Sequence, residues 1–245
     1  MNHVAKLSAL AALVAAGLAP LAAHADDGLS FNVGAVSDYR YRGISQTHLK
    51  PALQAGADFT KGPFYVGTWA STIKWIKDAG GDANVEIDVY GGYKGEIVKD
   101  LGFDVGVLTY VYPKNRLATS ANTTEVYGAV SFGPATLKYS HSVTNLFGFV
   151  DSKNSGYVDL GASFEVGPVV LAPHLGYQRV SKNGDYSYVD YSLTVSKEVV
   201  KGLTLSGALV GADTKKIAGT PAYYYVPKDK DLGKAGLVVG AKYAF

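Results

Sequence analysis

The sequence predicts an all-β protein, a transmembrane antiparallel up-and-down β-barrel of about 12 strands. Three observations support this fold class. Apolar residues alternate with small or polar residues along most of the chain after residue 25, as in strands with one apolar face. Tight turns alternate with longer loops along the chain. The closing stretch, GLVVGAKYAF, keeps the alternation up to Phe245.

The closing stretch resembles the C-terminal strand of bacterial outer-membrane β-barrels. Leu237, Val239, Ala241, Tyr243 and Phe245 lie two apart and share one face. In outer-membrane barrels, a terminal Phe with an aromatic residue two positions before it is read by the assembly machinery. The resemblance implies that periplasmic chaperones and the barrel-assembly machinery recognise this protein through Phe245.

The N-terminus has the pattern of a secretory signal peptide. Lys6 precedes an apolar run from Leu7 to Leu21, and Ala23-His24-Ala25 forms an A-x-A cleavage site. We expect residues 1–25 to be removed and residues 26–245 to form the barrel. The alternative is a membrane anchor, but the run is too short and too rich in alanine for that. Export and a barrel together predict the bacterial outer membrane.

The composition narrows the possible functions. The 245 residues contain no Cys, 29 Gly, 18 Tyr and one Met. The absence of Cys excludes a disulfide scaffold, thiol catalysis and thiolate metal sites. Lys and Arg number 23 against 21 Asp and Glu, a balance that does not favour nucleic-acid binding. The few His of the chain are scattered without metal-ligand spacing, so we expect no metal or other cofactor.

The alternation predicts twelve strands in order. They cover residues 29–41, 51–60, 64–75, 84–97, 101–112, 123–132, 135–144, 156–166, 169–180, 186–198, 203–212 and 236–245. The strand over 84–97 is the most regular, and two others are ambiguous. The strand over 64–75 can be phased either way, because Phe64 and Trp69 have opposite parity. Pro173 lacks a backbone N–H and suggests a bulge in the strand over 169–180.

The loop lengths and the aromatic residues indicate which end of the barrel is which. Connections after the even-numbered strands are tight, and most of the others are longer, as in barrels with short periplasmic turns and long outer loops. Aromatic rings collect where an apolar core meets water, so we expect two bands. The band near the short turns comprises Phe31, Phe59, Phe64, Phe103, Phe132, Phe164 and Phe245. The band near the long loops comprises Tyr39, Tyr41, Tyr110, Tyr112, Tyr186 and Tyr188.

The charged residues within strands take the parity opposite to the apolar face, which in a barrel is the lumen. The predicted pore-lining residues are Asp38, Arg40, Arg42, Asp58, Glu86, Asp88, Lys94, Asp104, Glu125, Lys138 and Asp190. The excess of acids predicts a mild preference for cations. The competing interpretation is a plugged barrel whose charges pair internally. For Asp38, Arg40 and Arg42, an ion pair that braces the first long loop is slightly favoured over a selective mouth.

Four segments resemble one known family. They are SDYRYRGISQT at 37–47, PALQAGAD at 51–58, GTWAS at 67–71 and EIDVYGGY at 86–93. Together they resemble the TorF-type porin family, bacterial outer-membrane proteins of unknown function. The motifs span about residues 37–94, and the strand rhythm agrees over the rest of the chain. The resemblance implies a β-barrel and passive solute transport, and it carries no catalytic residues.

The sequence therefore predicts an outer-membrane channel for passive diffusion of small hydrophilic solutes or ions, with outer-membrane lipid around it. The alternative is a non-conducting barrel that has a structural or ligand-binding role through its outer loops. A lipid-active enzyme is disfavoured, because His141 and Ser142 are adjacent and therefore point to opposite faces of their strand.

Overall fold

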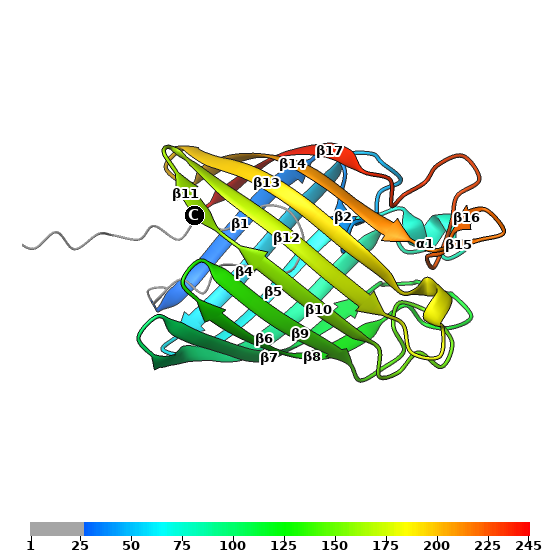
Figure 1. The fold of residues 1–245 in the computed structure, drawn as a ribbon, viewed down its shortest axis with the longest axis horizontal. Coiled ribbons are helices and arrows are strands. Elements are labelled where there is room, and N and C mark those ends of the chain that lie inside the picture. Colours follow the sequence, from blue (N-terminus) through cyan, green and yellow to red (C-terminus); the bar gives the residue numbers. More distant parts are fainter. Residues whose placement is uncertain (1–26) are drawn as a thin grey trace, which may run out of the picture.

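The computed structural model describes residues 27–245, and the predicted signal peptide lies outside them. Twelve antiparallel strands form one closed barrel (Figure 1). They are β1 (Gly28–Val36), β4 (Ala52–Lys61), β5 (Phe64–Thr72), β6 (Val85–Val98), β7 (Leu101–Val111), β8 (Thr123–Phe132), β9 (Ala135–Ser142), β10 (Gly156–Ala162) continued by β11 (Phe164–Val166), β12 (Val169–Arg179), β13 (Tyr188–Val200), β14 (Leu203–Thr214) and β17 (Gly236–Ala244). Each strand pairs with the next, and β17 pairs with β1 to close the ring. The predicted fold class is confirmed.

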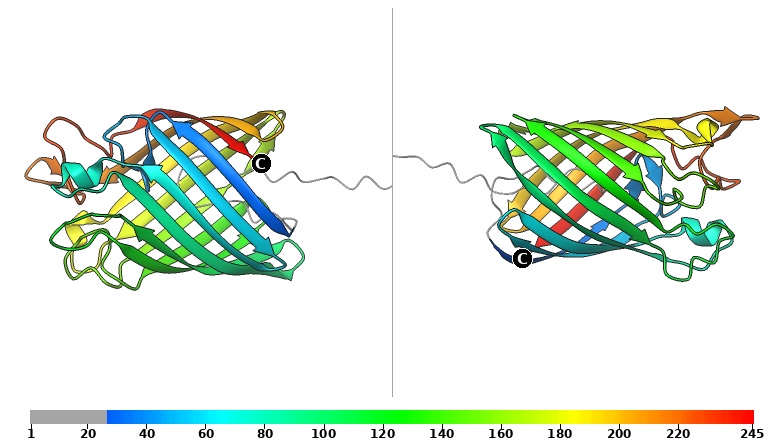
Figure 2. Two further views of the ribbon diagram at one scale, coloured as in Figure 1. Left: turned by 180° about the vertical axis from the view of Figure 1, so that it is seen from behind. Right: turned by 90° about the horizontal axis from the view of Figure 1, so that it is seen from below.

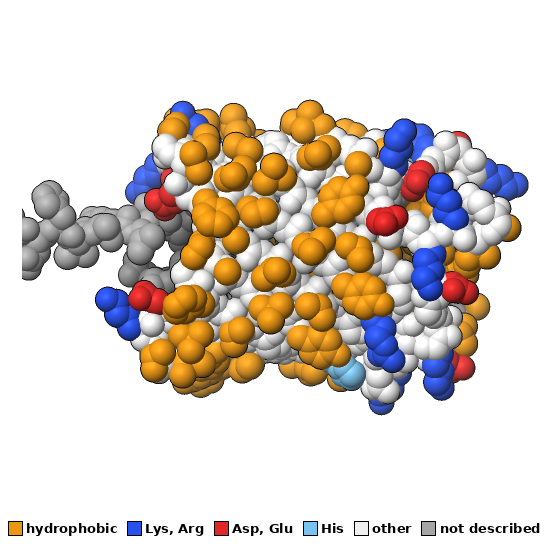
Figure 3. Space-filling model, viewed as in Figure 1, with side chains coloured by type: hydrophobic (Ala, Val, Ile, Leu, Met, Phe, Trp, Pro, Cys, Tyr) orange, Lys and Arg blue, Asp and Glu red, His pale blue; other side chains and the backbone are white. Residues whose placement is uncertain are grey.

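The barrel has its apolar residues on the outside. Along β13, Tyr191 and Leu193 are exposed, while Asp190 before them and Thr194 after them are buried. The other strands repeat this arrangement, and their outward side chains form an apolar surface around the barrel (Figure 3). A protein that folds in water buries such residues. A barrel that faces lipid exposes them, and turns its polar residues inward.

The two ends of the barrel differ. All five tight turns lie at one end, which we call the turn end, and all the long connections lie at the other, which we call the loop end (Figures 1 and 2). Gly133 and Gly167, each followed by Pro, have φ of +54° and +59°, a backbone conformation that favours glycine in a two-residue turn. At the turn end the rings of Phe31 and Phe245 stack, with their centroids 5.9 Å apart.

The loop end carries the small elements. These are the strand pair β2 (Arg40–Tyr41) and β3 (Ile44–Ser45), helix α1 (Trp75–Asp78), a 3-10 turn at Gly184–Tyr186, and the strand pair β15 (Lys216–Ile217) and β16 (Thr220–Pro221). Across residues 27–245, no helix has the length and apolar character that crossing a membrane requires.

The two ambiguous strands are resolved. In β5, Phe64 faces outward and Trp69 faces inward, where it packs edge-on against Tyr39. In β12, Pro173 stays in register with Leu193 of β13, so the expected bulge is absent. The irregularity falls on the neighbouring strand instead. The pairing with β12 is interrupted between β10 and β11, opposite Pro173, which has no N–H to donate.

Two other expectations are wrong. The first strand ends at Val36 rather than at residue 41, and the chain then turns back into the barrel. The Tyr residues assigned to a membrane band near the long loops do not face outward. Tyr39, Tyr41, Tyr110 and Tyr112 are buried in one cluster inside the loop end.

Candidate pore and inward loop

The interior of the barrel is lined by polar side chains in two layers. In the layer near the turn end, the Tyr90 hydroxyl donates to Asp58 (2.6 Å) and the Tyr65 hydroxyl donates to Asp104 (2.6 Å). All these side chains are half-buried rather than buried. This layer therefore leaves room between its walls.

Two lysines of the same layer lie over aromatic rings. Lys94 Nζ is 5.6 Å from the centre of the Tyr65 ring, and Lys138 Nζ is 4.0 Å from the centre of the Tyr127 ring. A cation over a ring face is attracted by the ring quadrupole. The two lysines are thus held against the wall beside the carboxylates.

The layer near the loop end is closed. Glu86, Asp88, Glu125 and Asp190 are each at most 2% exposed, although they belong to strands on different sides of the ring. Side chains of loop 1, residues 37–51, cover two of them, Glu86 and Glu125. The Tyr39 hydroxyl donates to Glu86 (2.7 Å).

Loop 1 crosses the lumen as a small hairpin formed by β2 and β3, which we call the inward hairpin (residues 40–45). Arg42, next to its tip, donates two hydrogen bonds to Glu125 of β8 (2.7 and 3.1 Å) and one to Gln178 of β12 (2.5 Å). The Arg42 guanidinium also lies 4.0 Å from the centre of the Tyr157 ring. Because β8 and β12 are both far from β1 around the ring, this one side chain joins the hairpin to the opposite wall.

Gly43 brings the tip of the inward hairpin against another part of the wall, formed by β13 and β14. Its φ is +78°, and a Cβ atom there would lie 2.6 Å from the carbonyl oxygen of Gly211 and 2.8 Å from Cβ of Asp190. Any larger residue would be strained and would clash with the wall. The close fit leaves no passage between the tip and the strands β13 and β14.

The base of the inward hairpin is fixed by Arg40. This side chain pairs with Asp38 and donates to the carbonyl oxygens of Gly43 (3.0 Å), Leu232 (2.9 Å) and Lys234 (3.2 Å). Leu232 and Lys234 belong to the last long loop, which precedes β17. The first and last long loops are thus joined around a buried guanidinium.

The structure places all eleven predicted pore-lining side chains inside the barrel, but in two groups. Asp38, Arg40, Arg42, Glu86, Asp88, Glu125 and Asp190 are buried in or beneath the inward hairpin, whereas Asp58, Lys94, Asp104 and Lys138 line the half-buried layer. Asp38 and Arg40 form an ion pair within loop 1, which is the arrangement that was slightly favoured over a selective mouth. Whether these residues line a conducting pore stays a prediction.

One interior cluster was missed by sequence reasoning. His174 of β12 lies between two carboxylates, 2.9 Å from Asp159 of β10 and 2.8 Å from Asp190 of β13, and the Tyr157 hydroxyl donates to Asp190 (3.0 Å). The sequence did indicate that these side chains point into the lumen, because each of the four residues alternates with apolar neighbours along its strand. Alternation does not show which inward side chains contact one another, because that depends on the register between the strands.

Among charged side chains inside the barrel, carboxylates outnumber cations. The acids are Asp38, Asp58, Glu86, Asp88, Asp104, Glu125, Asp159 and Asp190, and the bases are Arg40, Arg42, Lys94, Lys138 and Lys242, with His174 beside them. Arg40 and Arg42 both belong to loop 1. The wall without this loop is therefore more acidic than the lumen with it.

Three comparisons with known proteins bear on this barrel. A family model described as a bacterial protein of unknown function (Gcw_chp) matches residues 22–245. No curated protein matches the sequence. The name of the matched family differs from that of the TorF-type family, so the TorF-type assignment stays a prediction.

Similar solved structures are porins. The KdgM porin has a TM-score of 0.57 and 8% identity, with 88% of this chain and 99% of that chain covered. A structure of the KdgM porin in complex with disordered oligogalacturonate has a TM-score of 0.55 and 8% identity, with 89% and 98% covered. The NanC porin has a TM-score of 0.54 and 10% identity, with 88% and 99% covered. At such identities the likeness concerns the fold alone, which is porin-like.

Proposed function

The chain belongs to the Gcw_chp family of bacterial proteins of unknown function, and from its barrel we propose that it is an outer-membrane channel for small hydrophilic solutes or ions. Solutes diffuse passively through a narrow, charged lumen. Loop 1 closes the lumen in the conformation described above and opens it by withdrawing the inward hairpin. The protein reaches the outer membrane through a signal peptide cleaved after Ala25.

The observation that carries this proposal is the contrast between the two layers of the interior. A purely structural barrel of this width could fill its lumen with side chains from its own strands. Here the strands supply a polar, half-buried layer, and a loop supplies the closure. A barrel closed by a loop can be opened without unfolding any strand.

The charges of the interior suggest which solutes pass. The acids outnumber the bases, so cations and uncharged solutes are favoured over anions. The KdgM porin has been studied with oligogalacturonate, a polyanion. Such a chain would meet mostly carboxylates in this lumen, so we do not extend that ligand to this protein.

The alternative is a non-conducting barrel with a structural or ligand-binding role through its outer loops. The dense contacts of loop 1 favour it, because Arg42 and Arg40 bind the hairpin firmly to both the wall and the last loop. The two functions differ in one measurable property, which is whether loosening the inward hairpin produces ion flow.

Planar-bilayer recording of the purified protein tests the proposal. Arg42→Ala removes the contacts to Glu125 and Gln178, and breaking a buried pair of this kind costs the closed conformation about 3–5 kcal/mol. We expect larger and more frequent conductance steps for Arg42→Ala than for the unsubstituted protein. Under a salt gradient, the reversal potential should indicate cation preference.

Arg116→Ala is the matched control, because Arg116 is an exposed arginine in another long loop. It should behave like the unsubstituted protein. A folded Arg42→Ala barrel that stays silent would contradict the channel and support the non-conducting alternative. Anion preference would keep the channel but contradict the role of the interior carboxylates.

A further inference from the structure

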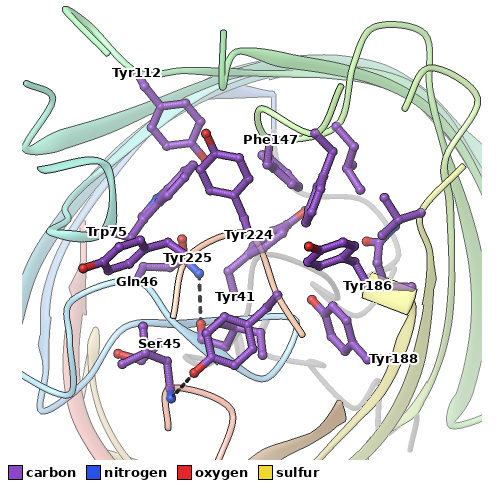
Figure 4. A pocket seen from close by; sticks show the side chains of 17 residues that line it. Tyr41, Ser45, Gln46, Trp75, Tyr112, Phe147, Tyr186, Tyr188, Tyr224 and Tyr225 are labelled. Atoms are coloured by element: carbon purple, nitrogen blue, oxygen red, sulfur yellow. Dashed lines mark hydrogen bonds between the residues drawn. The ribbon is translucent and has the colours of Figure 1, made fainter. Parts of the chain in front are cut away.

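A cavity of about 80 Å³ lies at the loop end, directly on the inward hairpin. Its floor includes Tyr41 and Gln46 of loop 1, and its walls come from the other long loops, including Trp75, Tyr112 and Tyr224 (Figure 4). The cavity is several times larger than the volume of roughly 10–15 Å³ that is needed to hold one water. It is separate from the half-buried layer near the turn end, since the inward hairpin lies between them.

The lining of this cavity is aromatic and uncharged. It contains no Asp, Glu, Lys, Arg or His, although the lumen below and the loops around it are rich in them. Its polar groups are Ser45, Gln46, Gln178 and the hydroxyls of seven Tyr, but most of the surface that faces the cavity is apolar. Burial raises the pKa of Tyr224, and it raises that of Tyr223 to about 12, so both phenols remain neutral at neutral pH.

The rings are held in defined positions by one another. Trp75 packs edge-to-face against Tyr112 (5.3 Å, 83°) and against Tyr224 (5.3 Å, 85°), and Phe149 also packs edge-to-face against Tyr224 (5.3 Å, 85°). Edge-to-face packing is a preferred arrangement of aromatic rings. The walls are therefore preformed for another ring of similar size.

One buried donor in the wall has no acceptor. Trp75 is 7% exposed, and its indole N–H has no hydrogen-bond partner within residues 27–245. A buried polar group of this kind is unfavourable unless a partner is supplied. The N–H itself has no accessible surface, so it lies within the wall and is not turned into the cavity.

We propose that this cavity binds a small uncharged molecule with a single aromatic ring and a hydroxyl or carbonyl oxygen. A charged ligand would give up its hydration without gaining an ionic partner. A sugar would bring many hydroxyls to a surface that is mostly apolar. An aromatic ring fits the edge-to-face walls, and its oxygen accepts a hydrogen bond from a tyrosine hydroxyl of the lining. The site goes beyond the proposed channel, because binding does not require conduction.

Tryptophan fluorescence provides a direct test with benzyl alcohol as the probe. The chain has two Trp, and Trp69 packs inside the barrel against Tyr39. The Trp69→Phe variant leaves Trp75 as the single reporter. We expect a saturable change in its emission with benzyl alcohol, and a response at least tenfold weaker with benzoate, which has the same ring and a negative charge.

Matched variants identify the site. In the Trp69→Phe background, Tyr224→Ala should weaken binding several-fold, while Tyr139→Ala, which removes an exposed ring on the outer face of the barrel, should leave it unchanged. Heat-modified gel mobility confirms that each variant is folded.

A response that rises linearly, and equally in the Tyr224→Ala and Tyr139→Ala variants, would indicate partition into detergent and would overturn the proposal. Equal binding of benzoate would overturn the assignment to uncharged ligands. None of these measurements depends on ion flow. The binding proposal can therefore be rejected without rejecting the channel proposal, and the channel proposal can be rejected without rejecting the binding proposal.

Discussion

Single residues decide whether the lumen is closed. Arg42 joins loop 1 to the far wall through Glu125 and Gln178, and Gly43 permits the close approach of the hairpin tip. The sequence identified Arg42 as an interior charge but not its partners. Glu125 lies 83 residues further along the chain, and a pattern of alternation contains no information about a contact at that separation.

A second set of contacts between single side chains joins loop 1 to helix α1. His48 Nδ1 lies 2.7 Å from one oxygen of Asp78, and Lys74 Nζ lies 2.6 Å from the other. Burial alone would raise the pKa of Asp78, but the hydrogen bonds from Lys74 and His48 outweigh it and hold the pKa below its ordinary value of 3.8. This contact therefore depends on the ionised carboxylate.

The lowered pKa predicts how this contact depends on pH. Because the folded pKa is below the unfolded one, the stabilisation is fully present above about pH 4 and is lost as pH falls through the folded pKa. At neutral pH, Asp78→Asn should weaken residues 73–80 by about 1 kcal/mol, seen as roughly fivefold faster hydrogen exchange than in the unsubstituted protein. Below the folded pKa the two proteins should exchange alike. An equal difference at both pH values would contradict the role of the charge.

At the scale of elements, the strands were predictable and the loops were not. Period-2 alternation located all twelve strands, because every strand has apolar residues on one face and small or polar residues on the other. The path of loop 1 into the lumen has no comparable pattern in the sequence. Tyr110 and Tyr112 were misassigned because tyrosine suits both a membrane interface and a buried cluster. Their parity, opposite to Val107 and Val111, already indicated the inward side.

The outward face of the strands predicts that a charge placed there destabilises the barrel in a membrane. Leu193 lies near the middle of β13, is exposed, and is flanked by Pro173 and Leu209 on the neighbouring strands. Leu193→Arg should destabilise the barrel in a lipid bilayer by about 2–4 kcal/mol, because it places a charge at mid-depth. Reversible unfolding in urea with lipid vesicles measures the change.

Ile217→Arg is the control for that experiment. Ile217 is also exposed, but it belongs to β15 in the last long loop, away from the apolar surface. It should change the free energy of unfolding by no more than about 0.5 kcal/mol. Equal effects of the two substitutions would show that the outer surface of the barrel does not face lipid.

At the scale of the whole molecule, the barrel is one sheet without free edges. β17 is paired on both sides, with β14 and with β1, and the backbone of Phe245 exchanges hydrogen bonds with Phe31 (2.8 and 3.0 Å). An unpaired strand edge is a site of aggregation, and closure removes it. The order of the strands around the ring follows from their order in the chain, which is why a sequence pattern predicted the topology so well.

The predicted recognition of Phe245 by the assembly machinery can be tested separately from the part that Phe245 plays in the fold. Phe245 and Phe132 are both highly exposed rings at the turn end, 64% and 68% respectively. We expect Phe245→Ala to reduce the amount of folded barrel in the outer membrane of cells several-fold, and Phe132→Ala to have little effect. Refolding into detergent from urea should be similar for the two variants. Equal yields in cells would contradict recognition through Phe245.

The pairing of β1 with β17 also determines when the barrel can close. A ribosome makes β1 first and β17 last, so during synthesis and export the earliest strand has only one of its two neighbours. The strands between them can form hairpins, but none of these intermediates is free of an open edge. Closure is therefore a step that follows synthesis, and the half-built chain must be kept apart from its own copies until its last strand arrives.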